Sequence, residues 1–555
     1  MCGIWAILGK LAQTQDVKKH LKALEARGPE YTACVEVSSI ETCEGSLPGM
    51  MGSTAYQMLL GFTRLAINGL TPAGHQPFQT PSTYTVCNGE IYNYLELAKR
   101  WQMNLEEGTS DCAVLPFLMQ RLQIKDVCRT LDGVFAFIHV DVKNNKVVVA
   151  KDPYGVRPLF QAEYTDGSMV WSSELKGLPP GYTTVAHFPP GTYRVFDLNT
   201  GRLLEAFRYH TVPHVKLAAF QNMNVAQQAL REALLSAVKK RLLSDRPIGA
   251  LLSGGVDSSL IAAIAARELA KKGKQLHTFS IGMRGSTDLF FAAKVAQHIN
   301  SIHHEVVVSP ETFLDAIPQV IYDAETYDIT SVRASVGNWL IGKHIKENTD
   351  IKVVFNGDGS DEIGGGYLYF YNAPSNEEFE AESERLLKEL HMFDVLRSDR
   401  SVAAHGLEAR TPFLDKNVVA TWRSIPTGFR RPIHGETDRM EKQILRDAFR
   451  EDNYLPFDVL YRKKEAFSDG VSSREDSWYK RCIEYAKKEG LGISEIKTMT
   501  QLWHNPPKTE EAYWYRRIFE QHFPWIAAKT IPYMWMPRWV GGATDPSART
   551  LTSLY

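Results

Sequence analysis

The stretch IGALLSGGVDSS, Ile248 to Ser259, decides the fold of the larger part of this chain. An apolar, β-prone run (Ile248 to Leu252) ends at Ser253-Gly254-Gly255, and the alanine-rich run after Ser259 is typical of a helix. A glycine-rich turn between a strand and a helix presents free backbone N–H groups and the positive end of the helix dipole to one point. The stretch therefore predicts an anion-binding loop at the carboxyl end of a strand.

The residues after this loop continue as alternating strands and helices. Apolar runs that predict strands occur at 276–282, 305–308 and 352–355. The runs between them, at 288–299, 310–325 and 332–347, have helical periodicity. This alternation predicts a doubly wound parallel α/β sheet with its ligand at the carboxyl ends of the strands. We expect one such domain over 226–555, beginning with an amphipathic helix at 226–243.

The first part of the chain is rich in strands instead. The predicted strands are GIWAIL, LLGFTRLAI, STYTVCNG, GVFAFIHVDV, KVVVAKDP and MVWSSE, separated by turn residues. One helix, DCAVLPFLMQRLQ, is predicted to begin at Ser110 or Asp111. Many strands with few helices indicate layered β-sheets covered by helices. We therefore expect a first domain over 2–209 and a linker over 210–225.

The size and composition of the chain exclude several classes of protein. Its 555 residues exceed what one hydrophobic core usually holds, and 44% hydrophobic with 23% charged residues is typical of a globular protein. The formal net charge of −1 gives no footprint for nucleic acid, and no apolar run reaches the roughly 18 residues of a membrane helix. The N-terminus lacks the basic leader of a signal peptide, and the seven cysteines form no CxxC pair, which argues against a disulfide framework or a thiolate zinc site. We expect a cytoplasmic protein that binds neither nucleic acid nor membranes.

Cys2 follows the initiator methionine directly. Removal of Met1 leaves a cysteine whose α-amino group, with a pKa of about 8, lies beside its own thiol. This amine can accept the thiol proton, so one residue supplies both nucleophile and base. A cysteine at this position alone is most often incidental, and the motifs that accompany it decide between the two interpretations.

Four further motifs resemble the class II (N-terminal-nucleophile) glutamine amidotransferases in order and spacing. They are Arg27-Gly28-Pro29, Arg64 to Ile67, Asn88 to Asn93, and Ser110-Asp111. The resemblance implies an α-β-β-α fold in which Cys2 attacks the glutamine amide while Asn88 and Gly89 form the oxyanion hole. The glutamine-binding residues that it implies are Arg64, Leu65, Ala66, Ile67, Asn68, Asn88, Gly89, Glu90 and Asp111.

Chemistry agrees with this assignment, because an amino acid needs a cationic partner, here Arg64, and anionic ones, here Glu90 and Asp111. Each residue also has a simpler interpretation. Asn88-Gly89 is typical of a hairpin turn, and Asp111 of a helix cap. The family usually has Asp where this chain has Glu30, so we assign Glu30 no role.

The loop at Ser253 is not the Walker pattern, because no Gly-Lys-Ser/Thr follows it. The string SGGVDSS resembles instead the pyrophosphate-binding loop of the ATP pyrophosphatase (adenylating) family, which implies ATP cleavage between the α- and β-phosphates. The alternative is an ordinary capped turn between a strand and a helix. The residues expected to contact ATP are Leu252, Ser253, Gly254, Gly255, Asp257, Ser258, Ser259, Ile281, Gly282, Asn356 and Gly357.

A second polar loop, NGDGSDEIGGGY, runs from Asn356 to Tyr367 after an apolar strand. Its three carboxylates, Asp358, Asp361 and Glu362, favour Mg²⁺, a hard cation that takes few protein oxygens and completes its shell with phosphate oxygens. The spacing does not fit the calcium loop of an EF-hand. A solvated acidic turn is the remaining alternative.

With these loops the whole chain resembles the glutamine-hydrolysing asparagine synthetase family. The matching strings also include ETYDITSVRAS (325–335), HGLEARTPFLD (405–415), MEKQILR (440–446), KKEAFSDG (463–470) and ATDPSARTLT (543–552). The resemblance implies Asp257 and Asp361 as Mg²⁺ ligands, and Asp358 and Lys464 as catalytic residues. It further implies Thr330 and Arg333 as aspartate-binding residues.

Two departures from the family pattern lie in one loop. The family commonly reads Ser-Gly-Glu-Gly-Ser-Asp-Glu where this chain has Asn356-Gly357-Asp358-Gly359-Ser360-Asp361-Glu362. Asp358 keeps the charge of glutamate on a shorter side chain, and Asn356 is bulkier than serine. Both changes bear on the efficiency of a synthetase site.

The expected function is glutamine-dependent asparagine synthesis, with glutamine, aspartate and ATP as substrates. Ammonia made at Cys2 passes internally to the second domain, where aspartate is activated as β-aspartyl-AMP. One rival is a β-lactam synthetase-like enzyme, although such proteins have generally lost the nucleophile and the glutamine-binding residues. The other is a non-catalytic nucleotide-sensing relative, favoured only by Asn356 and Asp358. Members of the family often form homodimers.

Overall fold

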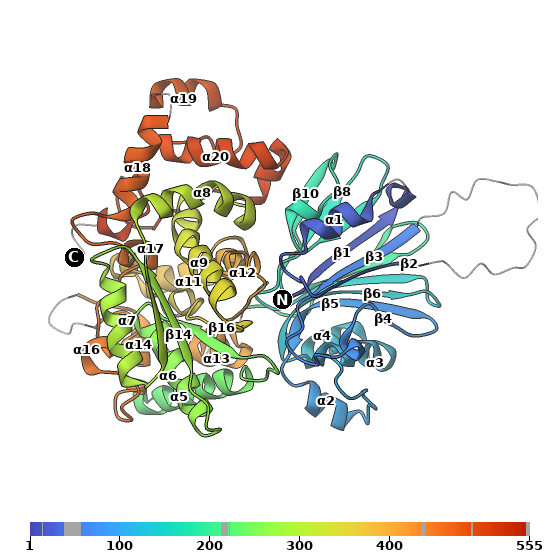
Figure 1. Cartoon of the computed structure of the whole chain (residues 1–555), viewed down its shortest axis with the longest axis horizontal. Coiled ribbons are helices and arrows are strands. Elements are labelled where there is room, and N and C mark those ends of the chain that lie inside the picture. The colour runs from blue at the N-terminus through green and yellow to red at the C-terminus, as the bar shows by residue number, and fades with distance from the viewer. Residues whose placement is uncertain are drawn as a thin grey trace, which may run out of the picture. The chain divides into compact units, whose positions relative to one another are not determined.

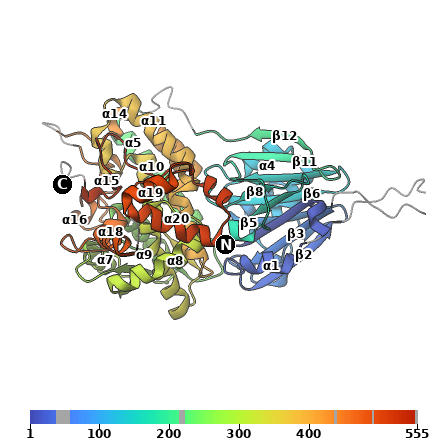
Figure 2. The same cartoon turned by 90° about the horizontal axis from the view of Figure 1, so that it is seen from above.

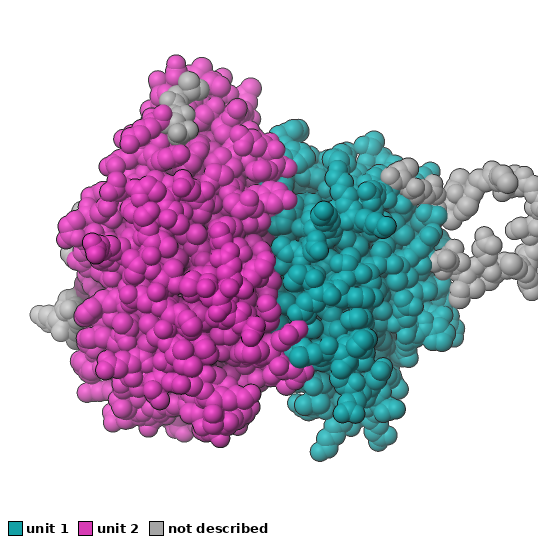
Figure 3. All heavy atoms as spheres, viewed as in Figure 1, with its two compact units in different colours: residues 1–211, 523–530 teal, residues 212–522, 531–555 magenta. Residues whose placement is uncertain are grey.

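We analysed a computed structural model, which describes residues 1–13, 15–37, 57–212, 220, 222–434, 439–489 and 492–550. The chain divides into two compact units (Figure 3). The first comprises Met1–Thr211 with Phe523–Thr530, and the second Val212–His522 with Ile531–Tyr555. Much of the predicted linker 210–225, together with Cys43 and the last two residues of the string 543–552, lies outside the described residues.

The first unit contains two sheets of six strands with the orders β10-β8-β9-β1-β3-β2 and β12-β11-β7-β6-β5-β4. The strands are β1 (Gly3–Gly9), β2 (Tyr31–Val37), β3 (Gln57–Arg64), β4 (Phe78–Gln79), β5 (Thr83–Ile91), β6 (Gly133–Asp141), β7 (Lys146–Lys151), β8 (Phe160–Glu163), β9 (Met169–Ser172), β10 (Thr184–His187), β11 (Thr192–Asp197) and β12 (Leu203–Arg208). The helices are α1 (Val17–Ala23), α2 (Tyr94–Arg100), α3 (Val114–Arg121) and α4 (Ile124–Thr130).

These elements form four layers, helix, sheet, sheet and helix (Figure 1). Alternate residues of β6 point to opposite faces, as a strand requires. Ala136 and Ile138 join the core between the sheets, whereas Phe135 and Phe137 pack with α3 and α4. On the outer face of the other sheet, Leu21 of α1 lies against β3. The predicted layered α-β-β-α fold is thus confirmed.

The second unit contains one parallel sheet with the order β15-β14-β13-β16-β17. The strands are β13 (Ile248–Leu251), β14 (His277–Gly282), β15 (Ile302–Val307), β16 (Val353–Phe355) and β17 (Glu408–Arg410). The helices are α5 (Met223–Lys240), α6 (Val256–Ala270), α7 (Thr287–His298), α8 (Pro310–Ala324), α9 (Ile329–Asn348), α10 (Ser360–Gly364), α11 (Asn376–Glu389), α12 (Asp394–Ala403), α13 (Lys416–Arg423), α14 (Thr427–Arg430), α15 (Gln443–Ala448), α16 (Phe457–Leu460), α17 (Phe467–Gly470), α18 (Trp478–Glu489), α19 (Ile493–Thr500) and α20 (Glu510–His522).

The strand order reverses between β13 and β16, which are neighbours in the sheet. Helices lie beside the strands β14 and β16 (Figure 1), and seen from above the second unit shows mainly helices (Figure 2), so the predicted doubly wound α/β fold is confirmed. The loop after β13 begins at Leu252 and the loop after β16 at Asn356, and both leave the same edge of the sheet. This reversal point is where open α/β sheets bind their ligands.

Three local expectations differ from the structure. Asn88 and Gly89 lie inside β5, so the hairpin-turn alternative is wrong. The predicted strand LLGFTRLAI ends at Arg64, because the chain turns at Leu65 to Asn68. The helix after Ser110 starts as a 3₁₀ turn (Asp111–Ala113) before α3, with the Ser110 hydroxyl accepting from the Cys112 N–H as a cap.

Candidate active sites

The candidate glutaminase site surrounds Cys2, which immediately precedes β1. The Cys2 backbone N–H donates to Asn88 Oδ1 at 3.1 Å, and its thiol donates to the Leu65 carbonyl at 3.8 Å. The Arg27 guanidinium donates to the Cys2 carbonyl at 3.1 Å and to Glu174 at 2.8 Å. The nucleophile is therefore fixed between the end of β3 and the middle of β5.

The side-chain amide of Asn88 is buried and only half used. Its oxygen accepts from Cys2, whereas Nδ2 has no hydrogen-bond partner among the residues that the structure describes. Buried donors are almost always satisfied, so an unused one beside a nucleophile points to a ligand atom. At the adjacent Gly89, a Cβ would come within 2.4 Å of the Val134 carbonyl, so only glycine fits there. The arrangement suits a developing oxyanion.

The predicted glutamine-binding residues gather around the turn after β3. Arg64 is buried and donates to the Thr71 carbonyl at 2.8 Å and to the Gly69 carbonyl. Asn68 Nδ2 donates to Glu90 Oε2 at 2.6 Å. Leu65, Ala66 and Ile67 form the buried backbone of this turn.

Two carboxylates brace this region. Glu30 Oε2 accepts from the Ala66 N–H at 2.8 Å, so the residue to which sequence reasoning assigned no role fixes the turn. Asp111 Oδ2 accepts from the Ile91 N–H at 2.5 Å, and Asp111 Oδ1 from the Ser110 hydroxyl at 3.1 Å. Asp111 thus lies close to β5, and part of its bonding capacity is used by the protein.

The second candidate site is a cavity at the carboxyl ends of β13 and β16. The predicted residues that line it are Leu252, Ser253, Gly255, Asp257, Ser258, Ile281, Thr330, Asn356, Gly357, Asp358, Asp361 and Lys464. Gly254, Ser259, Gly282 and Arg333 do not line it. The parallel sheet thus brings together most of the residues predicted for ATP and aspartate, although they come from distant parts of the sequence.

The glycine-rich loop explains why Gly254 is required without contacting the cavity. Gly254 has a φ of +72°, and a Cβ there would lie 2.6 Å from the Ala292 backbone nitrogen. The Ser253 and Ser258 hydroxyls are 2.9 Å apart, and Ser258 Oγ also accepts from the Ser253 N–H at 3.2 Å. These contacts hold the loop together internally. The backbone N–H groups at the start of α6 are the ones that can bind an anion.

Asp257 and Asp361, which line the cavity, form ion pairs with two lysines. Lys442 Nζ lies 2.6 Å from both Asp257 Oδ2 and Asp361 Oδ1, and its side chain is completely buried. Lys464 Nζ donates to Asp361 Oδ2 at 2.6 Å. Burial alone would raise the pKa of Asp361, but Lys442 and Lys464 outweigh it and hold that pKa far below its usual range. Asp361 therefore stays ionised.

Two of these carboxylates, Asp257 and Asp361, are the residues predicted to bind Mg²⁺. No group of three or more His, Cys, Asp or Glu side chains among the described residues is arranged to hold a metal. Asp257 and Asp361 nevertheless aim one oxygen each at the same cationic nitrogen, that of Lys442. Two carboxylates suit Mg²⁺ that arrives with phosphate oxygens, the usual way in which this ion is held.

The two departures from the family pattern contact each other. Asn356 Nδ2 donates to Asp358 Oδ2 at 2.8 Å and to the Ser398 hydroxyl at 2.6 Å. On the other side, Arg397 of α12 lies 3.3 Å from Asp358 Oδ1 and 3.1 Å from Asp394 Oδ1. The shorter carboxylate of Asp358 is therefore held by an amide that serine could not supply.

The two residues predicted to bind aspartate differ in their surroundings. Thr330 lines the cavity, and its Oγ1 has no hydrogen-bond partner within the described part of the chain. Arg333, one turn further along α9, is buried and donates to both oxygens of Glu511 (2.9 and 2.6 Å) and of Asp545 (3.0 and 2.8 Å). The guanidinium of Arg333 is therefore engaged by the protein outside the cavity.

Sequence reasoning missed several groups of this site. Arg397 and Asp394 line the cavity from α12, which carries no motif. Lys442 lies in the quoted string MEKQILR, but a lysine there gives no sign of its two carboxylate partners. Its φ of +54°, unusual for a non-glycine residue, is visible only in the structure.

Comparison with known proteins covers both units. Residues 229–383 and 374–530 match the family model described as asparagine synthase, and residues 48–229 match that of the glutamine amidotransferase domain. Proteins named asparagine synthetase [glutamine-hydrolyzing] from Cricetulus griseus and Homo sapiens are 42% and 41% identical to this chain, each over 100% of it and 99% of the relative. The chain belongs to the glutamine-hydrolysing asparagine synthetase family.

Proposed function

We propose that this protein is an asparagine synthetase that hydrolyses glutamine, activates aspartate with ATP and joins the ammonia to the activated aspartate. One conjunction carries the proposal. A single chain combines a cysteine beside an amide donor that has no partner among the described residues with a serine–glycine loop beside paired lysines and carboxylates. The first arrangement suits amide cleavage and the second suits transfer of an adenylyl group.

In the glutaminase half-reaction, the Cys2 thiolate attacks the side-chain carbonyl carbon of glutamine. The negative oxygen that forms accepts hydrogen bonds from Asn88 Nδ2 and the Gly89 N–H, which is worth orders of magnitude in rate. The Cys2 α-amino group, free once Met1 is removed, passes the proton that it took from the thiol to the amide nitrogen, and ammonia leaves. Water then hydrolyses the thioester to glutamate. Arg64 binds the substrate α-carboxylate, and Glu90 and Asp111 bind its ammonium group.

In the synthetase half-reaction, the β-carboxylate of aspartate attacks the α-phosphorus of ATP and pyrophosphate leaves. The N–H groups and hydroxyls between Ser253 and Ser259 bind the departing pyrophosphate, and Lys464 offsets its charge. Ammonia then attacks the β-aspartyl carbonyl and AMP leaves. Leu252, Ile281, Asn356 and Gly357 are the proposed nucleotide contacts, with Ser259 and Gly282 supporting the loops behind them.

Asp257 and Asp361 are the residues that would hold Mg²⁺, which supplies charge neutralisation to the phosphates when it is bound. Lys442 Nζ lies 2.6 Å from one oxygen of each of these two carboxylates.

For aspartate we propose Thr330 and Arg397, with Asp358 beside them. Both line the cavity, and the hydroxyl of Thr330 has no partner among the described residues. Arg333, predicted from the resemblance, does not line the cavity and is engaged by Glu511 and Asp545. A guanidinium is a suitable partner for a substrate carboxylate because its donors form a planar fork.

The test is the stoichiometry of products formed from glutamine, aspartate and ATP by the purified protein. We expect one AMP and one pyrophosphate for each asparagine. Formation of ADP in place of AMP would refute adenylation, and hydrolysis of glutamine without asparagine would leave only the first half-reaction.

We also propose a cytoplasmic location and a homodimer. The cysteines within the described residues are all free, which suits a reducing compartment. None of the helices that the structure describes is long and apolar enough to cross a membrane. Light scattering would measure the oligomeric state directly.

A further inference from the structure

In the segment Asp545–Arg549, near the C-terminal end of the described chain, successive residues have two different surroundings. Asp545, Ser547 and Arg549 make polar contacts with the rest of the second unit, whereas Pro546 and Ala548 line the synthetase cavity. The segment has only a short 3₁₀ turn of its own, at Ala548–Thr550, so these polar contacts determine its position. It therefore forms part of the cavity wall without being part of the sheet.

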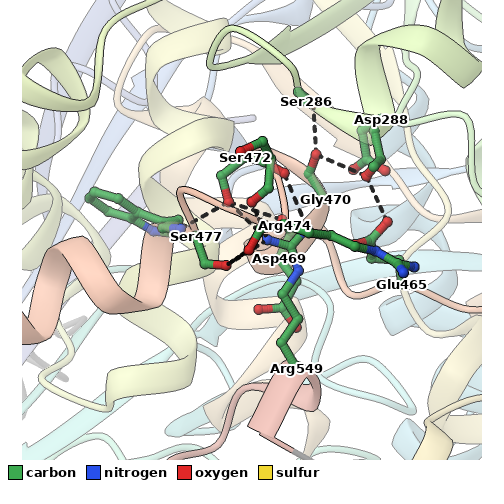
Figure 4. Close-up of polar contacts among 12 residues, drawn as sticks. Ser286, Asp288, Glu465, Asp469, Gly470, Ser472, Arg474, Ser477 and Arg549 are labelled. Carbon is green, nitrogen blue, oxygen red and sulfur yellow. Dashed lines mark hydrogen bonds and ion pairs between the residues drawn. The ribbon is translucent and has the colours of Figure 1, made fainter. Parts of the chain in front are cut away.

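Arg549 is the centre of the contacts (Figure 4). Its guanidinium donates to the Ser473 carbonyl at 2.7 Å, the Ser472 carbonyl at 3.1 Å and the Ser477 hydroxyl at 3.1 Å. It also donates to Glu465 Oε1 at 2.7 Å. Only 8% of its side chain is exposed, and Glu465 is exposed to 7%. Charge-assisted hydrogen bonds in such a dry environment are stronger than neutral ones.

Glu465 links Arg549 to the reactive groups. It directly follows Lys464, whose Nζ donates to Asp361, and its own Oε2 accepts from the Thr287 hydroxyl at 2.6 Å. Arg462 lies 3.1 Å from the same Oε2 and 3.3 Å from the Ser253 carbonyl in the pyrophosphate-binding loop. Arg549, Glu465 and Arg462 thus form a continuous path to the loop that begins at Ser253.

The other end of the segment is held independently. Asp545 forms the double hydrogen bond with Arg333, and Ser547 Oγ donates to Asp469 Oδ1 at 2.6 Å. Asp469 belongs to α17, in the same loop region as Glu465. Nearby, the Ser286 hydroxyl donates to the Gly470 carbonyl at 2.6 Å (Figure 4).

We infer that Arg549 and Asp545 are positioning residues of the synthetase site. They hold 545–549 as a wall of the cavity, and Arg549 holds Glu465 so that Lys464 stays in reach of the phosphates. This explains why Arg333 is buried against two carboxylates: it anchors Asp545. This inference rests on the proposed function, because its effect is measured as a change in the rate of asparagine synthesis.

The first experiment measures ammonia-dependent asparagine synthesis and glutamine hydrolysis in the full-length Arg549→Ala protein. We expect synthesis to fall about 10- to 100-fold, since small displacements of reacting groups cost this much, and hydrolysis to stay within about twofold. Arg549→Lys keeps the charge opposite Glu465 and should recover part of the loss. Arg481→Ala is the matched control and should change neither rate. It removes an ion pair with Asp476 at the surface, where 41% of the Arg481 side chain and 49% of the Asp476 side chain are exposed.

A double variant tests whether Arg549 acts through Lys464. In a Lys464→Ala background, the further change Arg549→Ala should add little, because the group that it positions is gone. Fully additive losses would overturn the inference, as would synthesis at the wild-type rate in Arg549→Ala or equal loss of both activities. A wild-type protein that makes no asparagine would refute the proposed function instead.

A second variant tests the wall without turnover. In the Ala548→Cys protein, the introduced thiol should be alkylated more slowly when ATP is bound. Mass spectrometry of the peptide that contains residue 548 measures this rate. In the Arg549→Ala background this protection should disappear. Alkylation of Ala548→Cys that ATP does not slow would overturn the assignment of the wall.

Discussion

The two candidate sites treat their buried polar groups in opposite ways. Beside Cys2, the amide donor Asn88 Nδ2 is buried and has no partner in the described part of the chain. In the cavity of the second unit, Asp361 is instead shared between the two ammonium groups of Lys442 and Lys464. The first site holds a donor ready for a charge that appears only during reaction, and the second holds charges already neutralised.

This difference follows from the ligands. The oxyanion of amide cleavage is transient, so a preorganised neutral donor gives most of its stabilisation in the transition state. A triphosphate brings its charge with it, so a cavity built to receive it would contain unpaired lysines if no carboxylate accompanied them. A substitution in the first site should therefore affect rate alone, and one in the second should affect both rate and stability.

Replacement of the nucleophile should separate the two sites most completely. In Cys2→Ala we expect glutamine-dependent asparagine synthesis to fall more than about 1,000-fold, because no thiol remains to form the thioester. Ammonia-dependent synthesis should stay within about twofold, and Cys34→Ala, at an exposed cysteine, should change neither. Both rates are measured as asparagine formed. Loss of ammonia-dependent synthesis in Cys2→Ala would contradict the independence of the sites.

Asn88→Ala should come next. Removal of one oxyanion donor costs about 100- to 1,000-fold in kcat, and we expect that loss in glutamine hydrolysis with little change in KM for glutamine. The melting temperature should change little more than in the control Asn144→Ala, at an exposed loop asparagine. A mainly KM effect would show that Asn88 binds the substrate and does not stabilise the oxyanion.

Lys442→Met should affect the second site in both rate and stability. Methionine fills much of the same space but leaves Asp257 and Asp361 facing each other, and removal of one partner from a buried pair costs roughly 3–5 kcal/mol. We expect ammonia-dependent synthesis to fall about 100-fold and the thermal transition of the second unit to shift down, with glutamine hydrolysis retained.

Lys271→Met is the matched control for this change, because Lys271 is 68% exposed and pairs with Glu268 at the surface. It should alter neither rate nor melting temperature. Unchanged stability in Lys442→Met would show that the two carboxylates find another cation.

The contrast between the sites also explains what sequence could predict. The residues around Cys2 lie in short contiguous motifs at the start of the chain, on the turn after β3 and on β5, so their order and spacing were legible. Asn88-Gly89 looked like a turn because the pair favours one locally, but the ladder between β5 and β6 overrides that preference. That Asn88 Nδ2 lacks a partner within the described part of the chain could not be predicted from sequence, since this depends on how distant segments pack around it.

The second site depends more on distant segments. The loop at Ser253 and the parallel sheet were predictable from local pattern and alternation. The strings 440–446 and 543–552 were matched to the family, but the places of Lys442, Arg397 and 545–549 around the cavity were not predictable, because each owes its position to packing across the unit. Arg333 illustrates the limit, since its place in a helix was expected from the run 332–347, whereas its carboxylate partners come from Glu511 and Asp545, far along the chain.

The contact between Asn356 and Asp358 gives the most delicate comparison within the second site. We expect Asn356→Ser, which removes the donor to Asp358 Oδ2, and Asp358→Glu, which lengthens the carboxylate, each to lower ammonia-dependent kcat about tenfold. The double variant restores the pair common in the family and should return to within about threefold of wild type, a coupling expected between contacting residues. Glutamine hydrolysis serves as the internal control and should stay constant in all three proteins. Losses that simply multiply in the double variant would mean that the two residues act separately, and that the 2.8 Å hydrogen bond between them does not compensate for the shorter carboxylate.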